Sequence, residues 1–295
     1  MDDIIVSNKE DFKNILGKFP LQIGVGCTKN KKVVLDTLWD KGCRLIDLEC
    51  SFEGENDKIL NNFIKDKKDF VLCQQFPLWD EDIYKETNIH IYEADDNQLE
   101  YIVDTIINKQ LEKNNVDFYH IYLLHSVFSM SYYDNYLDDI NLYIRIFKIL
   151  KKYKDKGVIQ HLGYSANIDY PLLELFTFSI NENFKFGDID IAMVPINIFS
   201  DVYKIIKNIY NINIWDSPGE RGIEFLKSRG YTIICMTPFE RGELKKINTI
   251  DLETLSKSNY EFLLKNNNID YILLGTSSIE HINEIFQIYS LTNKE

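Results

Sequence analysis

The chain has 295 residues, of which 45% are hydrophobic, and it carries a formal net charge of −13. This excess of acids argues against nucleic acid or a membrane surface as a partner, because phosphate binding needs clustered Lys and Arg. No stretch reaches the roughly 18 apolar residues of a membrane span, and the acidic N-terminus MDDIIVSNKEDFKN is unlike a signal peptide. We therefore expect a cytoplasmic protein with a large hydrophobic core.

Short apolar runs alternate with amphipathic stretches along the chain. The apolar runs predict strands at 21–26, 44–48, 70–75, 119–124, 160–165, 190–195, 231–236 and 270–274. The amphipathic stretches predict helices at 31–42, 56–66, 97–114, 138–156, 169–180, 219–229, 256–267 and 279–290. No linker rich in Pro, Gly or Ser interrupts the pattern, so we predict one domain over residues 1–295.

Eight alternating units predict an α/β fold, a (β/α)8 TIM barrel of parallel strands. A doubly wound open sheet is the alternative, but it does not require eight such regular units. Two connections are longer than the rest, at about 77–98 and 126–139. Both follow the carboxyl ends of strands, where TIM barrels build their active sites, so we expect both to be functional loops.

Four polar residues stand at the carboxyl ends of predicted strands: Asp47, Gln75, His125 and Ser165. The carboxylate of Asp47 and the imidazole of His125 are a candidate acid/base pair. The alternative for each residue is a structural role, with its hydrogen bonds satisfied at the rim of the barrel. For Asp47, the partner would then be Arg44, Gln75 or water.

Aromatic residues gather in the loops that follow the strands. The candidates for an apolar substrate pocket are Trp79, Phe128, Tyr132, Tyr133 and Tyr136. The alternative is that these rings pack the loops against the barrel.

The five cysteines are an odd number and have no CxxC spacing, which favours reduced thiols over a disulfide framework. Cys27, Cys50 and Cys73 lie near predicted strand ends, and His125 is next around the barrel. Such ligands suit zinc, but no pair has standard zinc spacing. We therefore predict no metal site.

Seven segments resemble the successive landmarks of the aldo/keto reductases, in the family's order. They read IDLECSFEGEN, LCQQFPLW, QLEKNNVDFYHIYLLHSV, GVIQHLGYSAN, DIAMVPINIF, GIEFLKSRGYTIICMTPFERGEL and ILLGTSSIEHINEI. The resemblance runs from residue 21 to about residue 286. It is nearest to the branch that often carries a C-terminal iron–sulfur extension, and no cysteine-rich tail of that kind occurs in this sequence.

The resemblance implies NAD(P)H-dependent carbonyl reduction by a tetrad of Asp, Tyr, Lys and His. The family's Asp falls on Asp47 and its His on His125, but its Tyr falls on Phe52 and its Lys on Gln75. Phe52 has no proton to donate, and Gln75 has no charge that would lower the pKa of a phenol. Loss of a general acid costs about 10²–10⁴ in rate, so we expect no efficient ordinary carbonyl reductase.

The family's cofactor contacts have changed as well. Candidate contacts that the sequence keeps are Ser165, Asn167, Gly242, Gly275, Thr276 and Ser277. The family's basic contact to the 2′-phosphate of NADP falls on His281, beside Glu280, and its nicotinamide-contacting Gln falls on Met193. These substitutions imply no cofactor or a weakly bound NAD(P), and they argue against tight NADP binding.

Three functions stay open at this point. The first, which we favour, is non-redox acid/base chemistry on a small molecule or peptide, such as an elimination, an isomerisation or a cyclisation. Its catalytic candidates are Asp47, His125 and Glu49. The second is an NAD(P)H-dependent oxidoreductase with an altered proton donor. The third is a non-catalytic binding or regulatory protein with a protein partner.

Overall fold

The computed structural model describes residues 10–24, 32–48, 56–67, 69–128 and 136–292. Within these ranges, eight parallel strands pair in chain order and close into a barrel. They are β1 Leu21–Ile23, β2 Leu45–Asp47, β3 Val71–Phe76, β4 Tyr119–Val127, β5 Ile159–Ala166, β6 Ile189–Pro195, β7 Thr232–Met236 and β8 Tyr271–Leu274. This confirms the (β/α)8 barrel and excludes the open sheet.

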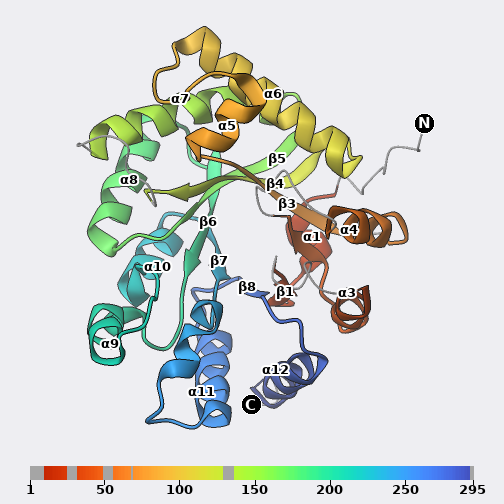
Figure 1. The fold of residues 1–295 in the computed structure, drawn as a ribbon, viewed down its shortest axis with the longest axis vertical. Helices are drawn as coiled ribbons and strands as arrows, with labels where there is room; N and C mark the ends of the chain where they lie inside the picture. Colours follow the sequence, from red (N-terminus) through yellow and green to blue (C-terminus); the bar gives the residue numbers. More distant parts are fainter. Residues whose placement is uncertain (1–9, 25–31, 49–55, 68, 129–135, 293–295) are drawn as a thin grey trace.

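Helices form an outer ring around the strands (Figure 1). The ring helices are α3 Lys32–Asp40, α4 Asn56–Lys65, α6 Asp96–Asn114, α7 Tyr136–Asp155, α8 Tyr170–Asn183, α10 Gly219–Ser228, α11 Leu252–Lys265 and α12 Ile279–Thr292. All eight were predicted, with ends that differ by a few residues. None of the helices in the described part of the chain is long and apolar enough to cross a membrane.

Five short helical elements were not predicted from the sequence. They are α1 Phe12–Leu16, α5 Asp80–Thr87, η1 Ser200–Val202, α9 Tyr203–Tyr210 and η2 Glu240–Lys246. Each is eight residues or shorter, too short to show a clear amphipathic period. Helix α1 packs its buried Phe12 and Leu16 against the inner barrel residues, which makes it part of the barrel core.

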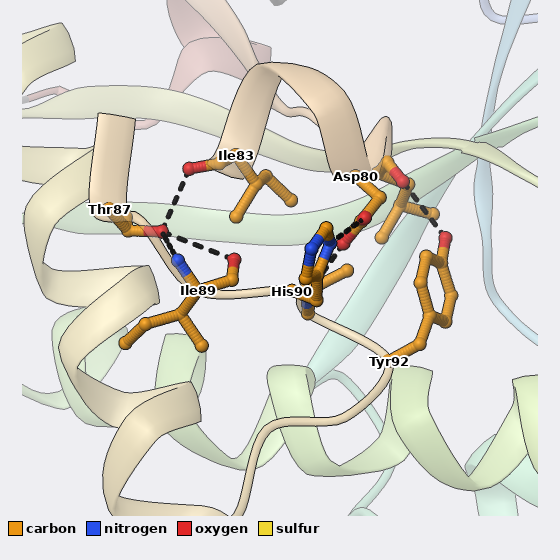
Figure 2. Close-up of polar contacts among 8 residues, drawn as sticks. Asp80, Ile83, Thr87, Ile89, His90 and Tyr92 are labelled. Atoms are coloured by element: carbon orange, nitrogen blue, oxygen red, sulfur yellow. Dashed lines mark hydrogen bonds and ion pairs between the residues drawn. The ribbon is translucent and has the colours of Figure 1, made fainter. Parts of the chain in front are cut away.

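The connection at 77–98, predicted as a long loop, is a folded segment (Figure 2). Asp80 at the start of α5 accepts a hydrogen bond from the backbone N–H of Ile91 at 2.8 Å, and one of its oxygens lies 2.5 Å from His90 Nδ1. The hydroxyl of Tyr92 donates to the carbonyl of Leu78 at 2.9 Å. These bonds close the segment on itself and fix the position of Trp79, which directly precedes α5.

The alternation of side chains along each strand decides which residues face the inside of the barrel. The inner core contains Leu45, Cys73 and Ile121, whereas Ile46 and Leu72 pack outward against the helices. Near the strand ends, the inward face of β2 to β5 carries polar side chains, whereas that of β6 and β7 stays apolar. The top layer of the barrel interior is therefore polar on the side of β2 to β5, at the end where TIM barrels bind their ligands.

Candidate functional site

The polar top layer brings together the four residues predicted at the strand ends. Asp47 ends β2, Gln75 lies in β3, His125 in β4 and Ser165 in β5. Asp47, Gln75 and Ser165 are buried, and His125 is partly exposed. The register of β2 on β3 pairs Asp47 with Cys73, which places Gln75 one inward position above it.

A chain of hydrogen bonds runs through this layer from β2 to β4. Gln75 Nε2 donates to Asp47 Oδ1 at 3.0 Å, and Gln75 Oε1 accepts from the hydroxyl of Ser165 at 3.0 Å. The same hydroxyl oxygen accepts from the backbone N–H of Ser126 at 2.8 Å. Ser126 Oγ in turn lies 3.0 Å from His125 Nε2.

This chain positions the side chains, but it does not conduct protons between Asp47 and His125. A neutral amide does not pass a proton from its oxygen to its nitrogen, and Ser126 joins the chain through two separate atoms. β3 lies between the strands of Asp47 and His125 and places Gln75 next to Asp47, and the acid/base role of the two residues stays a prediction. Of the structural alternatives for Asp47, the structure has Gln75, while Arg44 bonds the carbonyls of Trp39 and Cys43.

The backbone of Gln75 is also anchored by a hydrogen bond. Gln110 on α6 donates to the carbonyl of Gln75 at 2.9 Å, and its own side-chain oxygen accepts from the hydroxyl of Tyr122 at 2.5 Å. The amide of Gln75 is thus fixed by bonds to its side chain and to its backbone. A residue anchored in this way is poorly suited to move during a reaction.

His125 is neutral at neutral pH, because burial, and secondly the charge of Arg241, lowers the pKa of its imidazole to about 4. The ring of Trp79 meets it edge to face, with the ring centroids 4.9 Å apart. Trp79, a predicted pocket residue, therefore contacts a predicted catalytic residue.

A hollow of about 460 Å³ opens next to this layer, between the loops that follow β4, β5, β6 and β7. Its lining residues are Phe128, Asn167, Lys207, Asn213, Ile214, Trp215, Asp216, Glu240, Arg241 and Glu243. The volume lies within the range of about 300–1,000 Å³ of small-molecule sites. Two predicted site residues, Phe128 and Asn167, are therefore in the lining.

Glu240 is the buried acid of the hollow. Its Oε1 accepts from Asn197 Nδ2 at 2.8 Å and its Oε2 from the backbone N–H of Trp215 at 3.1 Å, which ties the loop after β7 to the loop after β6. Burial raises the pKa of its carboxyl from 4.5 to about 7, against the opposing effects of these two bonds and of Arg241. A group with this pKa can both hold and release a proton at neutral pH.

Of the other aromatic residues predicted to line a pocket, the structure describes Phe128 and Tyr136. The ring of Phe128 packs against Tyr143 and Phe176, and the ring of Tyr136 lies 5.9 Å from it, edge to face. Tyr132 and Tyr133, and also Glu49 and Phe52, lie outside the described residues.

The predicted cofactor contacts are spread over three loops. Ser165 belongs to the hydrogen-bond chain, Asn167 lines the hollow, and Gly242 lies in η2 with φ +90°. Gly275, Thr276 and Ser277 connect β8 to α12.

The start of α12 is already capped by its own residues. Thr276 Oγ1 accepts from the N–H of Ser278 at 3.2 Å, and Ser278 Oγ accepts from the N–H of His281 at 3.3 Å. The hydroxyl of Ser278 also donates to Glu280 at 2.7 Å. Two N–H groups that a phosphate would use at a helix N-terminus therefore have partners, and an acid lies beside them.

Cys73 is the described cysteine nearest to the polar layer. It is fully buried, and burial, with the charge of Asp47 as a second cause, raises the pKa of its thiol. Among the described residues, no three His, Cys, Asp or Glu side chains form a group that could hold a metal. Cys27 and Cys50 lie outside the described residues.

Sequence reasoning missed Glu240, Arg241 and Asp216. Of the segment TPFERGEL, only Gly242 was predicted as a site residue, and the acid Glu240 was not. Its signal was an acid and a base directly before a glycine in the loop after the seventh strand. In the fold, the carboxylate of Glu240 is enclosed by its bonds to Asn197 and Trp215 in another loop. No sequence pattern indicates these bonds.

Comparison with solved structures agrees with the architecture described above. An aldo-keto reductase from Klebsiella pneumoniae in complex with NADPH superposes with a TM-score of 0.62 at 12% identity, over 92% of this chain and 85% of that one. An aldo-keto reductase from Pseudomonas aeruginosa gives 0.60 at 15% identity, over 93% and 90%. The aldose reductase from Schistosoma japonicum gives 0.56 at 13% identity, over 93% and 88%. At these identities the likeness shows a shared fold.

No match to the chain was found among curated protein sequences. The sequence model of the aldo/keto reductase family, however, matches residues 27–261, which is most of the chain. The matched segment includes strands β2 to β7. Together with the closed barrel, this match shows that the chain belongs to the aldo/keto reductase family.

Proposed function

We propose that this barrel carries out non-redox acid/base chemistry, such as an elimination, an isomerisation or a cyclisation, on a small molecule or peptide bound at its C-terminal mouth. The observation that carries the proposal is the bond from Gln75 Nε2 to Asp47 Oδ1. An uncharged, firmly held amide occupies the place where the family resemblance expects a lysine. Because an amide carries no charge, Gln75 cannot supply the positive charge on which such a proton donor depends.

Glu240 supports the acid/base half of the proposal. Glu240 is one of the residues that line the hollow, and the pKa of its carboxyl is about 7, so both protonation states are populated at neutral pH. His125 is neutral in the adjoining layer and can accept a hydrogen bond or a proton from a bound molecule. In this mechanism Glu240 moves the proton, His125 orients the substrate, and Asp47 holds the Gln75 amide in place. Glu49 stays a candidate from the sequence.

The residues present fit a dinucleotide poorly. The N–H of Ser278, directly before α12, bonds to Thr276, the N–H of His281 in its first turn bonds to Ser278, and Glu280 stands beside them. The hydroxyl of Ser165 is used by Gln75. These observations support the proposal that no nicotinamide cofactor, or only a weakly held NAD(P), is bound.

An NAD(P)H-dependent oxidoreductase is the second candidate. Family membership favours it, as does the likeness to a Klebsiella pneumoniae enzyme solved with NADPH. This reading requires a replacement proton donor. Among the described tyrosines near the barrel, burial raises the pKa of Tyr164 well above its ordinary value, which makes it a poor donor.

Solvent-exchange experiments test the proposal. The purified protein is incubated in D₂O, without cofactor, with a panel of small carbonyl compounds, hydroxy acids and amino acids, and the products are analysed by NMR. We expect deuterium to enter at least one compound or its product. Glu240→Gln should slow this reaction by about 10²–10⁴, and His125→Ala should raise KM more than it lowers kcat.

The matched control is Glu224→Gln, at an exposed acid on α10 outside the hollow, which should react at the wild-type rate. Transfer of label from deuterated NADPH to a carbonyl compound would replace this proposal with the oxidoreductase reading. Equal exchange rates in the wild type and in Glu240→Gln would remove Glu240 from the mechanism.

A further inference from the structure

The charges that line the hollow are of both signs. Arg241 and Lys207 bring positive charge, and Asp216, Glu240 and Glu243 bring negative charge or can carry it. Trp215, Ile214 and Phe128 supply an apolar wall on the same hollow. A site of this kind matches a ligand that is partly apolar and carries both charges.

Two of these charged side chains have no ionic partner among the described residues. The guanidinium carbon of Arg241 lies over the ring of Trp215, 4.3 Å from its centroid, and no carboxylate oxygen in the described part of the chain comes within 4.0 Å of the guanidinium. Asp216, the next residue after Trp215, likewise has no Lys, Arg or His nitrogen within that distance in the same ranges. Opposite charges thus face one hollow without pairing with each other.

Glu243, unlike Arg241 and Asp216, has an ionic partner. It lines the same hollow, but its carboxylate accepts from Lys246 Nζ at 2.6 and 2.8 Å and from the backbone N–H of Asn213 at 2.9 Å. Its charge is therefore neutralised within the protein. The charges left for a ligand are those of Arg241 and Asp216, with Lys207 exposed on α9 at the edge of the hollow.

The backbone that presents Arg241 is strained. Glu240 and Arg241 have φ values of +48° and +54°, in the left-handed region that side chains other than glycine seldom adopt. Backbone strain of this kind clusters at ligand sites. The conformation turns Glu240 inward to its bonds with the loop after β6, while Arg241 stays at the surface over Trp215.

We propose that this hollow binds a small zwitterion with an aromatic or apolar side chain, in the manner of an α-amino acid or a very short peptide. Arg241 pairs with the ligand's carboxylate, Asp216 pairs with its ammonium group, and Trp215 and Phe128 pack against its side chain. The inference rests on the proposed function, because it names the substrate class of the same mouth. A dinucleotide is disfavoured, since its phosphates would meet the carboxyl groups of Asp216 and Glu240.

Calorimetric titration with three probes tests each contact separately. L-Phenylalanine carries both charges and a ring, 3-phenylpropionate lacks the ammonium group, and 2-phenylethylamine lacks the carboxylate. We expect L-phenylalanine to bind, and each of the other two to bind about tenfold more weakly or worse, because a charge-assisted hydrogen bond contributes about 1.5–3 kcal/mol.

Variants assign the charges to residues. Arg241→Ala should weaken the binding of L-phenylalanine and 3-phenylpropionate but leave that of 2-phenylethylamine unchanged. Asp216→Asn should weaken the binding of L-phenylalanine and 2-phenylethylamine but leave that of 3-phenylpropionate unchanged. The matched control for the first is Arg221→Ala, because Arg221 also stacks on an aromatic ring, that of Tyr170 at 4.5 Å, outside the hollow. Glu224→Gln is the control for the second.

The outcomes separate this inference from the proposed function. No binding of any of the three probes, or equal binding of all three by the wild type, overturns the zwitterion site. Deuterium exchange that depends on Glu240 in a compound without an ammonium group keeps the proposed function and overturns the ligand class. Charge-specific binding with no exchange in any compound keeps the ligand site and overturns the proposed function.

Discussion

The two halves of the mouth differ in whether all of their polar and charged groups have partners within the protein. On the side of β2 to β5, Asp47, Gln75, Ser165 and Ser126 form one continuous chain of hydrogen bonds within the protein. On the side of β6 and β7, the charge of Arg241 has no ionic partner among the described residues.

This difference indicates that the side of β2 to β5 stabilises the structure of the mouth, whereas the side of β6 and β7 keeps a charge available for a ligand. A buried polar group without a partner is costly, so a network of satisfied bonds stabilises the fold. Charges at the edge of a hollow cost less and remain available. Asp47 and His125, two of the positions that the family resemblance marks as catalytic, lie on the side of β2 to β5, whereas Glu240 and Arg241 lie on the other side.

Replacement of Gln75 should disrupt the hydrogen-bond chain on the side of β2 to β5. We expect the effect on stability to be larger than that of any other change proposed here. In Gln75→Ala, Asp47 loses one donor and Ser165 loses its acceptor, and both are buried, so the free energy of unfolding should fall by about 2–4 kcal/mol. Urea unfolding followed by circular dichroism measures it. Gln287→Ala, at an exposed glutamine on α12, should change the value by less than about 0.5 kcal/mol. An equally small change in Gln75→Ala would contradict the structural role of the chain.

Glu240 should make the second half sensitive to pH. The pKa of its carboxyl is higher in the folded protein, at about 7, than its ordinary value of 4.5, so its contribution is most favourable below pH 4.5. As pH rises towards 7 and beyond, the unfolded chain releases this proton first, and the free energy of unfolding should fall by about 3 kcal/mol.

The comparison that isolates this effect is between the wild type and Glu240→Gln, measured by urea unfolding from acid to mildly alkaline pH. The variant should lack that part of the pH dependence, while the opposite contribution of His125, whose pKa is lowered, is common to both proteins. Parallel curves for the two proteins would mean that Glu240 has an ordinary pKa.

Arg241 should connect the two halves electrostatically, with a smaller effect. Its charge is the second cause, after burial, of the lowered pKa of His125, so Arg241→Ala should raise that pKa while burial keeps it below 6.5. NMR titration of the His125 ring protons measures the shift. Arg221→Ala, which removes a stacked arginine elsewhere, should leave the titration unchanged. No shift in Arg241→Ala would show that the two halves are independent.

The smallest expected effect lies outside the mouth, in the segment of Figure 2. The hydrogen bond with Asp80 raises the pKa of His90, so their pairing is complete below pH 6.5 and is lost as pH rises through the raised pKa. Hydrogen exchange at the N–H of Ile91, which bonds to Asp80, should report this as faster exchange at higher pH. His90→Gln should remove the pH dependence, and exchange that stays pH-dependent in this variant, beyond the intrinsic rate, would contradict the assignment.

Much of the fold could be predicted because it depends on periodic patterns. The alternation of strands and helices predicted all eight strands and the barrel, and it placed Asp47, Gln75, His125 and Ser165 at one end. Short helices such as α5 and α9 were missed, because eight residues hold little more than two turns of periodic signal.

The site was less predictable, because its contacts join residues that are far apart in the chain. The position of Gln75 was predicted, but the sequence left Arg44, Gln75 and water as alternative partners of Asp47, and only the side-chain geometry identifies Gln75. The burial of Glu240 depends on Asn197 and Trp215 in another loop and on a positive φ at a residue that is not glycine. No local pattern indicates such an environment.

The measurement that tests the central claim most directly is a calorimetric titration of the purified protein with NADPH and with NADH. The claim is that a barrel of the aldo/keto reductase family uses this mouth without hydride transfer. We expect no saturable binding of either dinucleotide up to millimolar concentration. Micromolar binding of either one, together with transfer of its hydride to a carbonyl compound, would contradict the claim and make this protein an oxidoreductase with a different proton donor.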